Sequence, residues 1–317
     1  SLMDGTRDIT EIASAFKQYT GEPLPEEKVS EIIDYLDQSL FLDNETFNTH
    51  KEALYTSFAH SSVRPASHAG TAYEGEPEKL NQQLTEFFTS DDGPGLPDVG
   101  NPSGSIRALI APHIDLRRGG AAFAHSYYQL GSHSTASTFV ILGISHMMSE
   151  RRFILTRKSF ETPLGNVETD TEFIDELVCA CDYDFFTDEF NHKAEHSIEF
   201  QVLFLKYLYQ DRKDIHIVPI LCSGFNDLFP NENGPVSDKE VEQFITALSS
   251  AIEKRGERVC IIAGVDLSHL GKRFGQDVTI NEQFLEWMEQ EDRKMLSPVL
   301  GNDADSFFSF IRSEQDK

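Results

Sequence analysis

Cysteine and basic side chains are scarce in this chain of 317 residues. The four cysteines are too few and too irregularly spaced for a disulfide framework or a C-x-x-C zinc site, so we expect reduced, mostly buried thiols at Cys179, Cys181, Cys222 and Cys260. Only 27 Lys and Arg stand against 53 Asp and Glu, which gives a net charge of −26. Nucleic acid and anionic membranes would repel such a chain, and we predict neither as a partner.

Long apolar runs are also missing. No run of about eighteen apolar residues could span a bilayer, and no basic segment followed by apolar residues resembles a secretion signal. We therefore predict a cytoplasmic protein. The chain does have 39% hydrophobic residues, including 24 Phe, and a length typical of about two domains. It can bury a sizeable core.

Residues 1–62 form the first predicted domain. Apolar residues recur at helical spacing from Ile9 to Tyr19 and from Val29 to Leu40, with a break at Gly21-Glu22-Pro23. The pattern indicates a small helical domain, winged-helix-like, with a helix pair and a β wing. Such domains often bind DNA, but this segment carries 4 Lys and Arg against 12 Asp and Glu. Docking of a protein is therefore the better prediction.

Residues 63–317 form the second predicted domain, of the α/β class. Four short runs are almost continuously apolar, which is typical of strands covered on both faces. Helix-like stretches separate them, so we predict a three-layer α/β/α fold with a largely parallel or mixed central sheet. The predicted strands are 107–110, 138–142, 216–221 and 258–262, and the predicted helices are 120–130, 170–181, 197–209, 238–254 and 280–295.

Three of the four predicted strands end in a polar turn that contains a histidine. The first two turns hold His113 and His146, and the last holds Asp266, Ser268 and His269. Ligands of open α/β sheets collect beyond the carboxyl ends of the strands, so the three turns are predicted to converge. Two imidazoles with a carboxylate or a hydroxyl could hold a divalent metal and leave positions open.

A fourth candidate is the segment Glu195-His196-Ser197-Ile198-Glu199, at the start of an apolar predicted helix. His196, together with Glu195, could move protons beside the metal. Alternatively, Glu195 only stabilises the amino-terminal end of the helix, as acidic residues often do. The other caps expected for this helix are Asn191 or an acidic residue of the Asp188-Glu189 pair.

A rival motif overlaps this segment. His192-Lys193-Ala194-Glu195-His196 matches H-x-x-E-H, the signature of inverted zinc peptidases, in which two histidines one turn apart bind zinc. The match has two free positions in a chain rich in acids. It also needs His192 to lie inside the helix, whereas the residues around His192 are more typical of the approach to one. We rank this hypothesis below the site at the strand ends.

Taken together, the motifs resemble the Memo family, often labelled protein B of the AmmeMemoRadiSam system. Each motif is weak alone, but their order along the chain is specific. The similar segments are Val63–Tyr73, Glu78–Phe88, Ala111–His113, Leu142–His146, Thr162–Gly165 with Asp170, Glu195–Glu199, Ile217–Ile220 and Asp266–Gly271. The resemblance implies a fold similar to class III extradiol dioxygenases, which are non-haem iron enzymes.

The resemblance also implies a divalent metal, with Fe(II) expected first and copper or zinc as alternatives. Its ligands would correspond to His113, His146 and a residue of the last turn, with His196 nearby as an acid or base. Some relatives have a cysteine where this chain has Ser268, which is a poorer ligand. Asp266 or His269 could take its place. Proteins of a radical-SAM system are the partners that the resemblance implies.

Two arginines, Arg117 and Arg118, closely follow the first histidine. Guanidinium groups suit carboxylates and phosphates, and residues 101–160 hold 7 Lys and Arg against 2 Asp and Glu. We therefore expect an anionic small molecule or peptide as ligand, although a solvated loop explains the arginines equally well. The sequence predicts a metal-dependent oxidoreductase. The alternative hypothesis is a non-catalytic adaptor that uses the same crevice.

Overall fold

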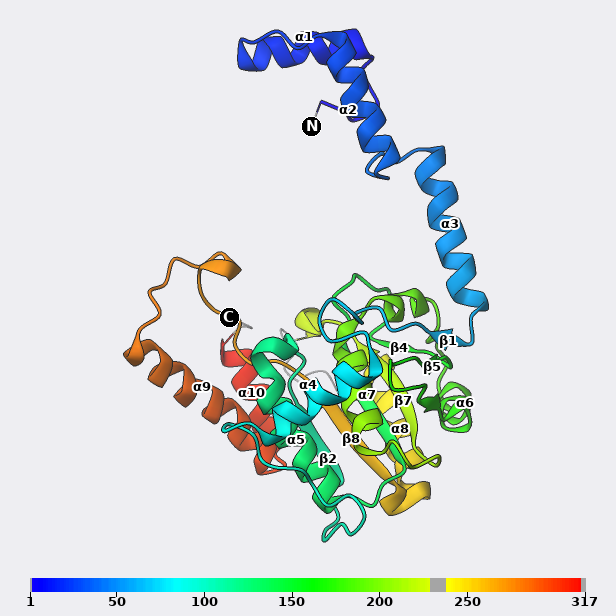
Figure 1. Ribbon diagram of the computed structural model, residues 1–317, viewed down its shortest axis with the longest axis vertical. Coiled ribbons are helices and arrows are strands. Elements are labelled where there is room, and N and C mark those ends of the chain that lie inside the picture. The colour runs from blue at the N-terminus through cyan, green and yellow to red at the C-terminus, as the bar shows by residue number, and fades with distance from the viewer. Residues whose placement is uncertain (1, 229–237, 315–317) are drawn as a thin grey trace. The chain divides into compact units, whose positions relative to one another are not determined.

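The computed structural model describes residues 2–228 and 238–314 and divides into two compact units, Ser1–Ser61 and Ser62–Lys317. The first unit consists of three helices (Figure 1): α1 (Ile9–Thr20), α2 (Glu26–Gln38) and α3 (Glu45–His60). Asp8 caps α1 in a capping box, and Gly21 ends it in the left-handed conformation at φ 79°. The first two helices confirm the predicted pair.

The predicted β wing is wrong, because no strand occurs among residues 2–61. The last part of this unit forms helix α3 instead. The side chain of Asn44 accepts a hydrogen bond from the backbone N–H of Phe47, which starts the helix. The sequence from there to His60 contains no glycine or proline that would end it.

A mixed central sheet organises the second unit. Its strand order is β2–β8–β3–β7–β4, and β6 also pairs with β7. All neighbours are parallel except β4, which runs antiparallel to β7. The strands are β2 (Ala108–Ala111), β3 (Thr138–Ile144), β4 (Phe153–Leu155), β6 (Glu168–Thr169), β7 (His216–Cys222) and β8 (Val259–Gly264). All four predicted strands are confirmed.

Helices cover both faces of this sheet (Figure 1), which confirms the three-layer α/β/α prediction. Phe139 and Ile141 of β3 pack in the core formed with α4, α5 and α7, whereas Val140 packs in the core formed with α6 and α8. This alternation explains the continuous apolar runs. The helices are α4 (Pro77–Thr89), α5 (Leu116–His133), α6 (Thr171–Ala180), α7 (His196–Leu208) and α8 (Lys239–Arg255).

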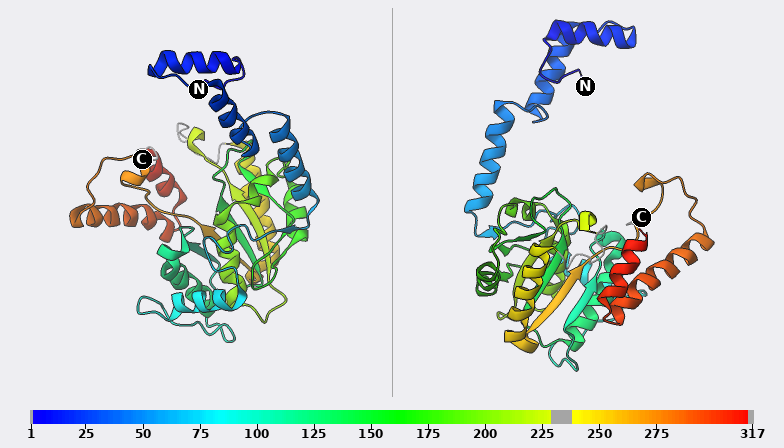
Figure 2. Two further views of the ribbon diagram at one scale, coloured as in Figure 1. Left: turned by 45° about the horizontal axis from the view of Figure 1, so that its top comes forward. Right: turned by 180° about the vertical axis from the view of Figure 1, so that it is seen from behind.

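Two further helices end the described chain. Helix α9 (Glu282–Leu300), which was predicted, and α10 (Ala304–Glu314), which was not, lie side by side in every view (Figure 2). A second, two-stranded parallel sheet pairs β1 (Val63–Arg64) with β5 (Ser159–Phe160). No described helix is long and apolar enough to cross a membrane.

Gly143, near the end of β3, lets the first turn of α7 approach the sheet. A Cβ atom there would lie 2.5 Å from Cγ1 of Ile198 and 2.7 Å from the Ser197 hydroxyl oxygen. That hydroxyl also donates to the carbonyl of Ile144 and accepts from its N–H, both at 3.0 Å. The start of α7 is thereby fixed against the carboxyl end of β3.

Gly143→Ala should therefore destabilise the fold by about 1–3 kcal/mol, because the new methyl group has no room. Urea unfolding would measure the loss. Gly224→Ala is the matched control, since a Cβ atom there meets nothing within 4 Å. Equal stability of the two variants would contradict the close approach.

Candidate metal centre

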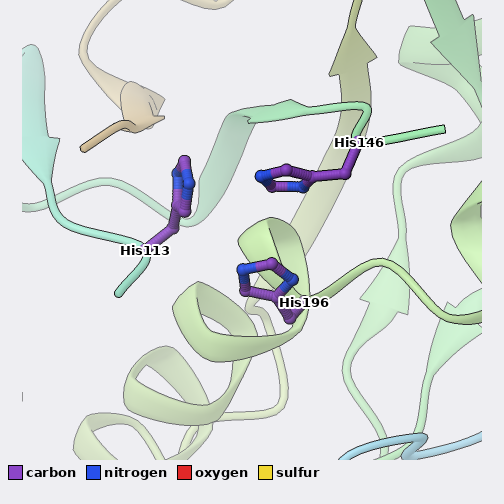
Figure 3. A group of neighbouring side chains, drawn as sticks. All are labelled: His113, His146 and His196. Carbon is purple, nitrogen blue, oxygen red and sulfur yellow. The ribbon is translucent and has the colours of Figure 1, made fainter. Parts of the chain in front are cut away.

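Three histidines converge at the carboxyl edge of the sheet. His113 follows β2, His146 follows β3, and His196 is the first residue of α7. Each offers one ligand atom, and these atoms all lie within 4.8 Å of one another. Figure 3 shows the three rings arranged around a common space. The convergence of the first two turns follows the prediction from the strand ends.

An oxygen lies close to the other nitrogen of each ring. Nδ1 of His113 lies 3.0 Å from the carbonyl oxygen of Gly264, and Nδ1 of His146 lies 3.0 Å from Oε2 of Glu195. Nδ1 of His196 lies 3.2 Å from Oε1 of the same carboxylate. With Nδ1 engaged in this way, Nε2 of each ring is left to bind a metal. Metal-binding histidines usually have such an oxygen partner on the far nitrogen.

The carboxylate of Glu195 contacts two of the three histidines, His146 and His196. Burial alone would raise the pKa of its carboxyl group, but the hydrogen bonds from the His146 ring and from the backbone N–H groups of Ser197 and His146 outweigh it and lower the pKa to about 2. In return, the hydrogen bond to Glu195 raises the pKa of His146. Burial lowers the pKa of His196. A buried negative charge therefore lies directly behind two of the three imidazoles.

Glu195 also caps α7, because its side chain accepts from the N–H groups of His196 and Ser197. The helix-stabilising role that the sequence offered is confirmed, and the same carboxylate also contacts the rings of His146 and His196. The other expected caps are wrong. Asn191 donates to Ser145 and to the carbonyl of Met148, while Asp188 accepts from the N–H groups of Glu150 and Arg151, and Glu189 accepts from Thr156.

The last predicted turn contributes less directly. Asp266 accepts a hydrogen bond from the backbone N–H of His113 at 2.8 Å, and its Oδ2 lies 3.7 Å from Nε2 of His113 and 3.6 Å from Nε2 of His269. The Ser268 hydroxyl donates to Asp292 of α9 at 3.0 Å. Ser268 and His269 are both exposed. Asp266 thus borders the three histidines, and Ser268 is already engaged elsewhere.

His192 does not join the group. It lies in a 3-10 helix, Glu189–Lys193, before α7 begins, and its Nε2 donates to the carbonyl of Ile154 at 3.0 Å. The ring is buried, and that burial lowers its pKa from 6.5 to about 3. His192 and His196 therefore do not stand one turn apart on one helix. The peptidase hypothesis is wrong.

The buried His192 makes the fold sensitive to acid. Below pH 6.5 the unfolded chain binds a proton that the folded protein accepts only near pH 3. The stability that neutral His192 gives is therefore complete above pH 6.5 and is lost as the pH falls toward 3, by about 1.4 kcal/mol per pH unit. His192→Gln keeps a donor for Ile154 but does not titrate. Urea unfolding between about pH 6 and pH 4 should show a flatter pH dependence for the variant, and parallel curves would contradict this assignment.

Arg117 and Arg118 lie in the first turn of α5, and both are exposed. Arg117 donates to the carbonyl oxygen of Thr71 at 3.2 Å. A cavity of about 760 Å³ borders the loop 266–270. Its described lining is apolar and acidic, without Lys or Arg, so an anionic group is better suited to Arg117 and Arg118. That lining includes Asp266, Phe284, Trp287, Asp292, Phe310 and Glu314.

Other residues beside the centre were not predicted as functional. The ring of His68 packs edge-on against His196 at a centroid distance of 5.8 Å. Arg64 and Glu199 form a wholly buried ion pair behind the start of α7. Arg64, His68 and Tyr73 belong to the segment Val63–Tyr73, which the sequence connects only with the resemblance to the Memo family. The sequence offers one sign that Arg64 matters, namely a single arginine between apolar and small residues.

The chain has clear relatives. The family model described as Memo-like protein matches residues 64–317. A MEMO1 family protein of Aquifex aeolicus is 32% identical over 275 residues, which cover 87% of this chain and 67% of that protein. The chain belongs to the Memo-like family. MEMO1 family proteins of Methanobrevibacter smithii and Sulfolobus acidocaldarius are 30% and 36% identical, and each match covers 65% of this chain and 70% of the relative.

The Memo-like match covers the whole centre. It begins at Arg64 and includes His113, His146 and His196, whereas the helices α1 to α3 lie outside it. The resemblance inferred from the motifs is therefore confirmed at the level of the family. A metal centre is also compatible with the Memo-like domain, since its three histidines could hold an ion.

Proposed function

We propose that this Memo-like chain is a metal-dependent oxidoreductase whose divalent ion is held by His113, His146 and His196. The observation that carries the proposal is the set of three rings, each with Nδ1 beside an oxygen and one nitrogen facing the others. Such a ring arrangement fits a metal centre better than a general hydrogen-bond network, because hydrogen bonds at Nδ1 orient the rings of His113 and His146 and a carboxylate lies beside Nδ1 of His196.

Three imidazoles suit iron, zinc or copper and leave coordination positions for substrate or water. We propose Fe(II) first, and when bound it would supply redox chemistry. His196 thus replaces the last-turn ligand expected from the sequence. Because the Ser268 hydroxyl is bound to Asp292, we do not propose Ser268 as a ligand.

The chain's own polar groups define the remaining roles. Asp266 contacts His113, and Nε2 of His269 lies 3.6 Å from Oδ2 of Asp266, so we assign to these two side chains proton transfer to and from the substrate. The exposed guanidinium groups of Arg117 and Arg118 would bind the anionic part of a small molecule or acidic peptide. Radical-SAM-system partners and a cytoplasmic location stay predictions.

Anaerobic calorimetric titration of the metal-free protein with Fe(II) tests the binding step, with zinc and copper(II) in parallel. We expect one saturable site per chain. Nitric oxide added to the iron-loaded protein then tests for an open position, since a free position gives the EPR signal of an iron–nitrosyl. A bound but closed metal would favour the non-catalytic adaptor, and absence of a saturable site would refute the metal centre.

A further inference from the structure

Arg64 is wholly buried, and its hydrogen bonds go to backbone and carboxylate oxygens close to the centre. Nε donates to the carbonyl of His192 at 2.9 Å, and Nη2 donates to the carbonyl of Glu195 at 2.8 Å. Nη1 donates to the carbonyl of Pro65 and to the carboxylate of Glu199. One guanidinium group thus joins the segment at residue 64 to both ends of the turn that precedes α7.

Glu199, the partner of Arg64, is also fully engaged. Its Oε1 accepts from the Tyr73 hydroxyl and from the backbone N–H of His68, and its Oε2 accepts from Arg64 and the N–H of Ser67. Burial raises the pKa of Tyr73, and the charge of Glu199 adds to the effect, so the hydroxyl stays a donor. The ion pair clamps segment 64–73 against the first turn of α7.

Arg64 also contacts Glu195, the residue that orients the proposed metal-binding histidines. Arg64 holds the backbone of Glu195, and the carboxylate of Glu195 binds the ring and the N–H of His146 as well as the N–H of His196. We propose that Arg64, held by Glu199, is a positioning residue for the metal centre that acts through Glu195. This inference rests on the proposed metal-binding function.

Stability alone does not explain the pair. Buried ion pairs stabilise a fold weakly, because removing two charges from water offsets their attraction, and apolar residues often fill the same space as well. The planar guanidinium instead offers donors in fixed directions, which a lysine cannot reproduce. Such fixed geometry is what a group needs to hold three carbonyl oxygens and a carboxylate at once.

The test compares Arg64→Lys with a matched control, Arg255→Lys. Arg255 also forms an ion pair, with Glu176, in which the side chains are 14% and 37% exposed, and its guanidinium lies 4.4 Å from the ring centroid of Phe173. That pair belongs to α6 and the end of α8, away from the strand ends that carry the histidines. We expect Arg64→Lys to weaken Fe(II) and zinc binding about tenfold, as loss of an outer partner does, and Arg255→Lys to change it by less than about twofold.

Two further readouts separate positioning from general destabilisation. In metal-free protein, Arg64→Lys should speed hydrogen exchange at the backbone N–H groups of His146, His196 and Ser197, which bind Glu195. In a Glu195→Gln background, the effect of Arg64→Lys on metal affinity should fall below about twofold, because both changes act on one connection.

If Arg64→Lys does not fold, Tyr73→Phe replaces it, since that change removes one hydrogen bond from Glu199 and keeps the ion pair. The expected loss of metal affinity is then about threefold, below the range for a direct outer partner. Unchanged amide exchange and unchanged metal affinity would overturn the inference. If wild-type protein binds no metal, the proposed function fails, while the exchange rates still decide whether Arg64 positions Glu195.

Discussion

Replacing His113 with alanine should remove the bound metal from the protein. Three imidazoles form the proposed site, and a two-histidine remnant lacks the donors for tight binding. We expect metal content to fall from about one ion per chain to near zero, with the same result for His146→Ala and His196→Ala. Elemental analysis of protein purified without chelators measures this loss, and circular dichroism confirms that the variants are folded.

Two control variants make this prediction specific to the three histidines. Ser268→Ala and His269→Ala alter the last turn, which the sequence alone favoured as a source of ligands, yet both side chains are exposed. They should keep their metal. If Ser268→Ala or His269→Ala loses the ion while His196→Ala retains it, the ligand set proposed from the structure is wrong.

The second large effect is expected for Glu195→Ala. The variant loses the carboxylate that contacts His146 and His196. Metal affinity should therefore fall by roughly 10-fold to 100-fold, as is typical when the hydrogen-bond partner of a metal ligand is removed. It also loses the cap of α7, which should lower the free energy of unfolding by about 1 kcal/mol. Metal titration and urea unfolding measure the two effects separately.

Asp170→Ala is the matched control for the cap. Asp170 accepts from the N–H of Phe173 at the start of α6 and does not contact the three histidines. Its removal should cost a similar unfolding free energy and leave metal affinity unchanged. A comparable drop in metal affinity for both variants would show that the effect of Glu195 is only a general loss of stability.

The sheet and the first two histidines could be predicted because they depend on local patterns. Strands buried on both faces give continuous apolar runs, and His113 and His146 each follow such a run directly. Parallel strands then bring these turns together at one edge. The capping role of Glu195 could also be predicted, because the residue stands at the start of an apolar helix.

The remaining features depend on contacts between distant segments. Ser268 lies in a long irregular stretch between β8 and α9, where no periodic pattern indicates which way a side chain points. Arg64 contacts residues more than 120 positions away in the chain. Its role follows from the pairing of β1 with β5, and two-residue strands leave almost no pattern in a sequence.

X-ray absorption spectroscopy of the iron-loaded protein tests the central claim most directly, because it counts the imidazole ligands of the bound ion. The structure predicts three imidazole nitrogens at about 2.1 Å, from His113, His146 and His196, and these should drop to two in a variant of one of these histidines that still retains metal. A wild-type spectrum with two imidazoles and a carboxylate would contradict the three-histidine ligand set and make Asp266 the first candidate for the third ligand. A spectrum without imidazole would contradict the metal centre itself.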